Sequence, residues 1–438
     1  MGPGRHKAVT VKPPTLRPLP ERASESWPPV VVASVFQTGL NLIRDLSRLG
    51  VRTFGVDCIA SHAGFRSRYG KSYLCPDPDR QPAEWVAFMK WLARQIGGKP
   101  EMGGKPEFGG KPVIIPAADI FVSALGAHAA ELASDYCFSG DAVAVQAALA
   151  TKEQQYALAA KAGFPCPRSE YVQGRADLEA FCREARFPCL IKPRSQREWE
   201  VLPEGNPLRG KKIATADTAA ALLERYSHAE AFQPQAVVQE IVTGPDDAKY
   251  CYLSVYGRDR SRLGHCVVRQ LRTHPMGFGS ASMVQPVVDE EIAGMCDRFL
   301  RSVGYVGICE IELKRDARDG KVRLIEVNPR WSVTADCSTY AGVHLGWLHY
   351  LDLIGEPVAA TTATRFDFRH IVLYREAPGF GQYLDAGLTT WRKWWGAYFP
   401  PVEFFDFDWR DWKVTGSTLY DAARALAGGI LRHWKLRA

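Results

Sequence analysis

The segment that most constrains the fold is residues 304–330, GYVGICEIELKRDARDGKVRLIEVNPR. Residues 308–314 alternate apolar with polar residues, and 322–327 form a second, largely apolar run. The charged turn between them ends in Asp319-Gly320, a pair that suits left-handed turn geometry. The segment therefore predicts a β-hairpin, and the two-residue period of each strand fixes which side chains share a face.

Oxygen-bearing side chains gather on one face of this hairpin. The alternation places Glu310 and Glu312 together on the first strand, and the second strand delivers Glu326 and Asn328. Carboxylates with an amide oxygen form a hard-cation site, which Mg²⁺ completes with phosphates and water. A solvent-facing amphipathic hairpin is the alternative, but the apolar neighbours of Glu326 favour burial, where a carboxylate needs a partner. We therefore predict Glu312, Glu326 and Asn328 as metal ligands.

The ending I-E-V-N-P-R resembles the E-x-N-x-R ending of the ATP-grasp superfamily, and the preceding I-E-L-K strand matches it too. Further matches occur upstream in the required order. TKEQQYALAAKAGFPCP, residues 151–167, resembles the start of the ATP-grasp domain, and FPCLIKP, residues 187–193, its phosphate-binding strand. The resemblance runs from about residue 151 to 330 and, with a plausible preceding domain, covers three quarters of the chain. It is to enzymes of the carboxylate–amine (or carboxylate–thiol) ligase kind.

The resemblance implies that two lysines bind the phosphates of ATP. It implies that Lys152 reaches the phosphates of ATP, although taken alone this residue would be interpreted as a solvated helix residue. It implies that Lys192 contacts the α- and β-phosphates. Independently of the family, an ammonium group among apolar strand residues is unfavourable unless it meets an anion. The polar segment 194–208 that follows is expected to be a mobile flap over the triphosphate.

Residues 236–247, AVVQEIVTGPDD, resemble the interdomain hinge that receives adenine. In such a hinge, strand backbone groups read the ring edge and apolar side chains sandwich the ring. The resemblance implies nucleotide binding by Gln239, Glu240, Val242 and Asp247, with Asp247 on the ribose hydroxyls. A plain turn is the alternative interpretation of Asp247 and its acidic neighbour.

Two arginines complete the expected catalytic set with Lys192. Arg330 follows Asn328 by two residues and adds a fixed positive fork for phosphate or carboxylate. Arg272 ends a predicted strand before the G-F-G-S loop, where it would face an acidic substrate or the γ-phosphate. A surface ion pair is the alternative for Arg272. No Ser, Cys or His nucleophile signature is evident, which fits a mechanism without a covalent enzyme intermediate.

The predicted architecture is an α/β pre-ATP-grasp domain followed by a two-lobed α+β ATP-grasp domain and an aromatic-rich C-terminal extension. The strand–turn–helix–strand pattern at 30–57 indicates a βαβ unit without the G-x-G-x-x-G fingerprint, which disfavours a dinucleotide site. The repeated Gly-Lys-Pro phrase at 97–112 is expected to be a mobile surface insertion. We place the boundaries at 1–28 for a disordered leader, 29–140 for the first domain, 141–360 for the ATP-grasp domain (lobes 141–235 and 236–360) and 361–438 for the C-terminal accessory region.

Composition excludes several other classes. The eleven Cys are scattered without zinc spacing, which indicates the reduced thiols of a cytoplasmic protein. No apolar run reaches about 18 residues, so no membrane span is expected. A net charge of +7 without a basic run or a known motif argues against nucleic-acid binding. The final helix, 418–436, combines apolar and basic residues, so it could rest on an anionic membrane, pack against the core or form a homodimer.

The predicted function is an ATP-dependent ligase that activates a small-molecule carboxylate as an acyl phosphate and joins it to an amine. ATP and Mg²⁺ are the expected cofactors, with Mn²⁺ as an alternative metal. Two rival functions stay open at this point. One is another ATP-grasp chemistry, such as bicarbonate or phosphoryl-acceptor activation. The other is a non-catalytic nucleotide-binding scaffold, which would bind nucleotide without releasing ADP.

Overall fold

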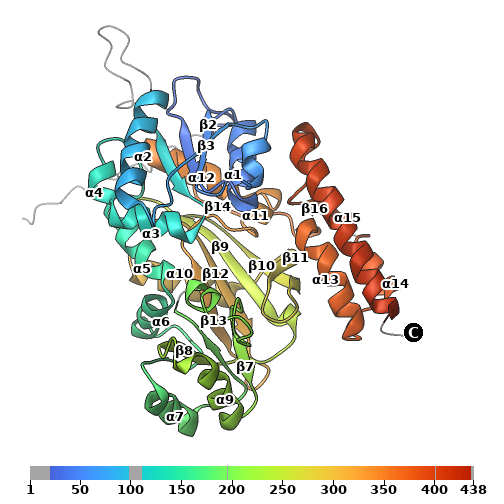
Figure 1. Ribbon diagram of the computed structural model, residues 1–438. Helices are drawn as coiled ribbons and strands as arrows, with labels where there is room; N and C mark the ends of the chain where they lie inside the picture. The colour runs from blue at the N-terminus through green and yellow to red at the C-terminus, as the bar shows by residue number, and fades with distance from the viewer. Residues whose placement is uncertain (1–19, 98–110, 195, 400, 436–438) are drawn as a thin grey trace, which may run out of the picture.

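The computed structural model describes residues 20–97, 111–194, 196–399 and 401–435 (Figure 1). Residues 1–19 of the predicted leader and most of the Gly-Lys-Pro segment lie outside this range. No helix among the described residues combines the length and the apolar composition that a membrane crossing requires. Three β-sheets organise the described chain.

The first sheet has the parallel strand order β3-β2-β1-β4 and confirms the predicted βαβ unit. Its central strand reads VVVA and is buried on both faces, as parallel strands covered by helices are. Helix α1 returns the chain to β2 and buries Leu42, Ile43 and Leu46 against the sheet. The elements are β1 Val30–Ala33, α1 Gln37–Arg48, β2 Thr53–Asp57, η1 Ala63–Arg66, β3 Lys71–Leu74, α2 Pro82–Ile96, β4 Val113–Pro116, α3 Asp119–Ala127 and α4 Ala129–Leu132.

A small antiparallel sheet, ordered β5-β8-β6-β7, forms the lower part of the molecule in Figure 1. Three apolar residues of the segment predicted to be a flap, Trp199, Leu202 and Leu208, are buried in the core of this lobe. That segment therefore contributes packing to the lobe. The elements are η2 Gly140–Ala142, α5 Val143–Ala150, α6 Lys152–Lys161, β5 Ser169–Val172, α7 Arg175–Glu184, β6 Cys189–Lys192, α8 Gln196–Glu200, β7 Ala214–Ala216, α9 Ala219–Glu230 and β8 Ala236–Glu240.

The large sheet runs β13-β12-β9-β10-β11-β15-β16, with β14 beside β10. Alternation along its strands separates two apolar faces: Ile311 and Leu313 pack with α10, whereas Ile308 packs with α12 and the first sheet's helix α1. The site described below lies along this sheet. Its elements are η3 Asp246–Ala248, β9 Lys249–Tyr256, β10 Arg262–His274, β11 Ser280–Val287, α10 Glu290–Ser302, β12 Gly307–Arg315, β13 Val322–Asn328, α11 Asp336–Tyr340, α12 Leu345–Ile354, β14 Thr361–Thr362, β15 Arg369–Ile371 and β16 Val402–Phe404.

The C-terminal region extends the large sheet through β15 and β16 and adds α13 (Leu373–Asp385), α14 (Trp391–Gly396), η4 (Trp409–Asp411) and α15 (Trp412–Lys435). Helices α13 and α15 lie side by side at one edge of the molecule (Figure 1). Phe380 packs on Trp394 with ring centroids 4.7 Å apart. The aromatic residues of α13 and α14 thus form a small core that joins this region to the sheet.

Candidate active site

The acidic residues of the predicted hairpin meet in the structure. In the β12–β13 register, Glu312 lies opposite Glu326 and Glu310 lies opposite Asn328. The side-chain amide of Asn328 donates to Glu310 at 3.0 Å and approaches Glu312 at 3.5 Å. The three residues predicted as metal ligands are therefore brought together on one face, as the two-residue period requires.

Glu310 is held by hydroxyl groups that sequence reasoning did not assign to it. Its carboxylate accepts a hydrogen bond from Ser332 Oγ at 2.6 Å and another from the hydroxyl of Thr334. The side chain is buried, and these donors satisfy it. Glu310 therefore holds Asn328 in place through its hydrogen bond, whereas Glu312 and Glu326 line the cleft beside the hairpin.

The charge on this face fits a divalent cation. Burial, with Glu310 and Glu326 close by, raises the pKa of Glu312 to about 8. Burial also acts on Glu326, but the neighbouring Lys152 outweighs it and lowers the pKa of that carboxyl. Within the described residues, no three His, Cys, Asp or Glu side chains form a metal site by themselves. Two carboxylates and an amide match Mg²⁺, which takes few protein ligands and completes its shell with water and substrate phosphates.

Both predicted lysines lie beside these acids. Lys152, the first residue of α6, forms an ion pair with Glu326. Lys192 ends β6, with its ammonium 3.5 Å from Gln239 Oε1 and 5.7 Å from the centre of the Tyr156 ring. Burial, followed by the charge of Lys152, lowers the pKa of Lys192 to about 8. An ammonium group with so depressed a pKa gains stability when an anion approaches it.

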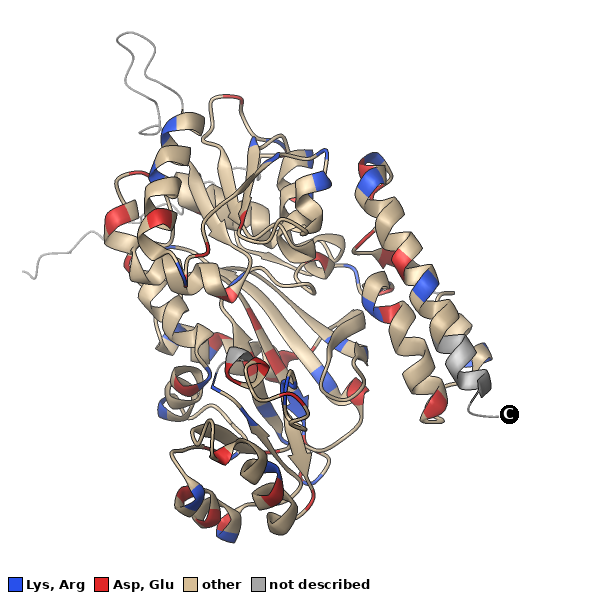
Figure 2. Cartoon of the chain, viewed as in Figure 1, with Lys and Arg blue, Asp and Glu red and all other residues tan. Residues whose placement is uncertain are grey.

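A cleft leads from the acids to the hinge. Figure 2 shows acidic and basic residues together on the strands in the middle of the molecule, where β12 and β13 lie. The lining residues are Pro167, Leu190, Gln239, Glu240, Ile241, Val242, Lys249, Gly277, Phe278, Gly279, Ser280, Glu312, Leu313, Lys314, Ile325 and Glu326.

The hinge residues Gln239, Glu240, Ile241 and Val242 line this cleft. The Glu240 carboxylate accepts from the Arg186 amide at 2.8 Å, and the Ile241 amide donates to the Pro188 carbonyl at 2.9 Å. Among the described residues, the Val242 amide has no hydrogen-bond partner. Val242 lines the cleft, so its unpaired N–H is a candidate donor to an acceptor bound there, such as a ring nitrogen.

Two further lysines, Lys249 and Lys314, were not singled out from the sequence. They lie opposite each other on β9 and β12, and both line the cleft. Burial, followed by the charge of Lys249, lowers the pKa of Lys314. The alternation that groups Glu310 with Glu312 places Lys314 on the same face, so this residue could have been found from the sequence. Lys249 could be assigned to the site only from the register of β9 with β12.

Asp247, predicted to bind ribose, is not among the residues that line the cleft. It forms an ion pair with Arg269 at 2.8 Å. Its neighbour Asp246 lies closer to the cleft: its carboxylate is 3.1 Å from the Lys249 ammonium and accepts from the Gly277 amide at 3.1 Å. The acid that contacts the cleft lining is therefore Asp246, which was not the residue chosen from the sequence.

The two predicted catalytic arginines occupy different places. Arg330 contacts Asn328 Oδ1 at 3.0 Å and pairs with Asp119, the first residue of α3, at 2.6 Å. Arg272 is not brought into the cleft. It is buried beneath the C-terminal region, 2.7 Å from Glu376 and 3.8 Å from the centre of the Trp394 ring. The pairing of Arg272 is internal, and not the surface ion pair considered as its alternative.

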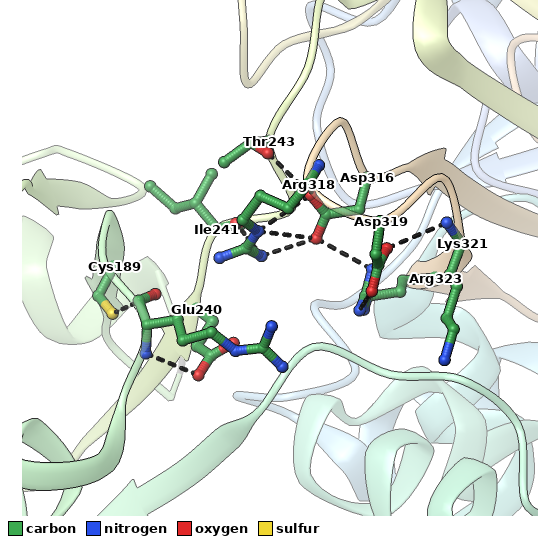
Figure 3. A network of polar contacts seen from close by, with 10 residues as sticks. Cys189, Glu240, Ile241, Thr243, Asp316, Arg318, Asp319, Lys321 and Arg323 are labelled. Atoms are coloured by element: carbon green, nitrogen blue, oxygen red, sulfur yellow. Dashed lines mark hydrogen bonds and ion pairs between the residues drawn. The ribbon is translucent and has the colours of Figure 1, made fainter.

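A buried carboxylate ties the hairpin turn to the hinge (Figure 3). Asp316 accepts hydrogen bonds from Arg318 at 2.7 Å, Arg323 at 3.0 Å and the Thr243 hydroxyl at 2.7 Å. Arg318 also donates to the Ile241 carbonyl at 3.1 Å. Burial opposes the ionised form, but these donors outweigh it and hold the pKa of Asp316 well below its ordinary value. The turn thereby fixes the hinge relative to the acidic face.

The fold and parts of the sequence are similar to those of known ligases and carboxylases. D-aspartate ligase of Enterococcus faecium (strain Aus0004) is 21% identical over 241 residues, which cover 53% of this chain and 56% of the relative. The arginine-specific carbamoyl phosphate synthase large chain of Geobacillus stearothermophilus is 26% identical over 184 residues, 40% of this chain and 16% of the relative. The chain thus spans about half the length of the first relative and much less of the second. No family model matches.

Solved structures agree over a longer stretch. N5-carboxyaminoimidazole synthetase from Staphylococcus aureus, complexed with ADP, superposes with a TM-score of 0.59 at 11% identity over 82% of this chain and 86% of that chain. The biotin carboxylase domain of Hydrogenobacter thermophilus 2-oxoglutarate carboxylase, in complex with MgADP, ADP and bicarbonate, superposes with a TM-score of 0.57 at 13% identity. The match covers 78% of this chain and 72% of that chain. The chain therefore has a mixed α/β fold of the ATP-grasp, carboxylate–amine ligase-like kind.

Proposed function

We propose that this protein is an ATP-dependent ligase that activates a carboxylate as an acyl phosphate and joins it to an amine, with release of ADP and phosphate. One observation carries the proposal: Glu312 and Glu326 lie beside Lys152 and Lys192 at a cleft that continues to the hinge. This arrangement suits a triphosphate with its metal at one end and a purine ring at the other. The likeness to D-aspartate ligase supports the same reaction class.

In this proposal the hinge orients the nucleotide. The free amide of Val242 donates to the adenine ring, and the backbone of Glu240 lies beside it. Lys192 and Lys152 neutralise the phosphates, and Lys249 and Lys314 add positive charge along the cleft. Mg²⁺, held by Glu312, Glu326 and Asn328, would supply charge neutralisation at the β- and γ-phosphates, with Mn²⁺ as the alternative metal.

The chemistry follows from that orientation. An oxygen of the substrate carboxylate attacks the γ-phosphorus in line, the bond to the β-phosphate bridging oxygen breaks, and ADP leaves. The amine then attacks the acyl carbon and loses a proton, and phosphate departs to leave an amide. Arg330, whose guanidinium contacts Asn328, stabilises the charge that develops on the acyl phosphate or the tetrahedral state. Arg272 has no part in this proposal, because Glu376 and Trp394 hold it elsewhere.

The substrates are proposed by class: a small carboxylic acid and an amine, with an amino acid favoured by the likeness to D-aspartate ligase. A second candidate is carboxylation with bicarbonate, which the likeness to a biotin carboxylase domain described with bicarbonate favours. Because the reaction consumes ATP and the eleven Cys form no disulfide, we propose a cytoplasmic location.

A pairwise screen tests the function. Purified protein with Mg²⁺ and ATP is offered carboxylates, bicarbonate and amino acids in all pairs, and ADP release is measured. The proposal expects ADP release that requires both a carboxylate and an amine, with an amide among the products. A carbamate or phosphorylated product would favour the carboxylation or phosphoryl-transfer rival. Nucleotide binding without ADP release for any pair would indicate a non-catalytic scaffold and contradict the proposal.

A further inference from the structure

A second hollow, separate from the nucleotide cleft, lies between the end of α1, the segment after η1, and η4. It is open to solvent and shares no lining residue with the cleft. Its lining is basic and aromatic. The residues are Arg22, Ser47, Arg48, Arg68, Tyr69, Trp409 and Arg410. We call this hollow the arginine groove.

Two buried carboxylates fix the walls of the arginine groove. Asp411 accepts from Arg44 at 2.7 Å, from Ser67 Oγ at 2.7 Å and from the Arg68 amide at 3.0 Å. Asp408 pairs with Arg48 at 2.8 Å. These contacts join the C-terminal region to the first sheet's helix and loop. The groove is therefore preformed, because each buried carboxylate is satisfied in the position that shapes it.

The groove carries positive charge that carboxylates of the described residues do not pair with. Within the described residues, Arg22, Arg68 and Arg410 are exposed and have no carboxylate within ion-pair distance. Only Arg48 is paired, with Asp408. Guanidinium groups that converge on one hollow raise the local positive potential and attract anions. This charge pattern indicates an anionic ligand.

We propose that the arginine groove binds a phosphate group, supplied either by a soluble phosphate ester or by an anionic lipid headgroup. Guanidinium forks match the oxygens of phosphate through paired N–H donors. Trp409 is 71% exposed and forms an aromatic wall of the groove. The guanidinium carbon of Arg410 lies over its ring, 5.1 Å from the ring centroid. Trp412, 68% exposed, follows it on α15. If the phosphate is that of a lipid, these indole rings would lie at the membrane interface.

The test uses the full chain with the nucleotide cleft saturated with MgADP. Binding of glycerol 3-phosphate is measured by calorimetry, and binding to vesicles by co-sedimentation, with phosphatidylglycerol–phosphatidylcholine vesicles compared against phosphatidylcholine alone. Arg68→Glu and Arg410→Glu are the test variants, because neither residue pairs with a buried acid through its side chain. Arg183→Glu, an exposed arginine on α7, is the matched control. Arg48 is left unchanged, because its loss would strand buried Asp408.

The expected result is saturable binding in at least one arm that each groove variant weakens by about tenfold or more, while Arg183→Glu binds normally. Binding of the ester identifies a soluble ligand, and binding of anionic vesicles alone identifies a lipid headgroup. Absence of binding in both arms overturns the proposal, as does binding that the groove variants leave unchanged. If one glutamate variant fails to fold, as judged by circular dichroism, Arg68→Gln and Arg410→Gln replace the pair. None of these outcomes depends on the proposed ligase activity.

Discussion

Glu312 and Glu326 lie directly opposite each other on β12 and β13, yet among the described residues only Glu326 forms an ion pair with a lysine, Lys152. The two carboxyls consequently differ, because burial and its acidic neighbours raise the pKa of Glu312 while Lys152 lowers that of Glu326. A cation between them would relieve the repulsion that the ion pair leaves. The ion pair between Lys152 and Glu326 therefore links helix α6 to the acidic face of the large sheet.

Replacing Glu326 by Gln removes one charged ligand without changing the side-chain size. We expect Mg²⁺ to enhance ADP binding to the wild-type protein and this enhancement to fall by about 10- to 100-fold in Glu326→Gln. Calorimetry with and without Mg²⁺ measures it, and substrate-dependent ADP release should be abolished. Glu84→Gln, at an exposed position on α2, is the control. Retained turnover in Glu326→Gln with an intact fold would contradict the metal-ligand assignment.

The depressed pKa of Lys192 predicts how nucleotide affinity depends on pH. Binding favours the ammonium form, so affinity is full below about pH 8 and falls as the pH rises through the pKa of the free protein. Because one proton must bind to Lys192, nucleotide affinity should fall by about tenfold for each pH unit above this pKa. Calorimetry of ADP binding without metal, between pH 6.5 and 9.5, compares wild type with Lys192→Arg, whose charge persists. The arginine variant should show a flatter profile, and Lys212→Arg, at an exposed site, should not. Identical profiles for wild type and Lys192→Arg would refute this role.

Asp316 should stabilise the junction between hairpin and hinge. Asp316→Asn removes the charge that Arg318 and Arg323 share, and we expect a loss of about 3 kcal/mol in the free energy of unfolding at pH 7. Because the folded-state pKa lies below the ordinary 3.8, this contribution is present above that value and is lost as the pH falls below it. Urea unfolding at pH 7 and at pH 3.5 measures the difference between wild type and variant, which should shrink at the lower pH. Asp217→Asn, an exposed site, should unfold like wild type at both.

Arg272 should matter for stability. Glu376→Gln leaves the buried guanidinium without its counter-charge, and breaking a buried pair costs about 3 to 5 kcal/mol. Arg272→Met together with Glu376→Leu removes both charges and should recover much of the stability. Thermal unfolding and ADP binding are measured for both proteins. A double variant that folds like wild type but binds ADP poorly would restore the predicted role of Arg272 at the nucleotide.

The sequence by itself determined the local elements of the site. A two-residue alternation fixes which side chains share a strand face, so the grouping of Glu312, Glu326 and Asn328 followed from the order of residues. Likewise, a lysine at the end of an apolar strand needs an anion wherever the strand lies, which marked Lys192.

Only the tertiary structure decided which partners distant residues have. Arg272 and Glu376 are far apart in the chain, and the packing of α13 on β10 pairs them. The choice between Asp246 and Asp247 depended on the conformation of a short turn, and Lys249 joined the site through the register of β9 with β12. Periodicity describes one element at a time, whereas these contacts depend on how separate elements pack, and that information is spread over the whole chain.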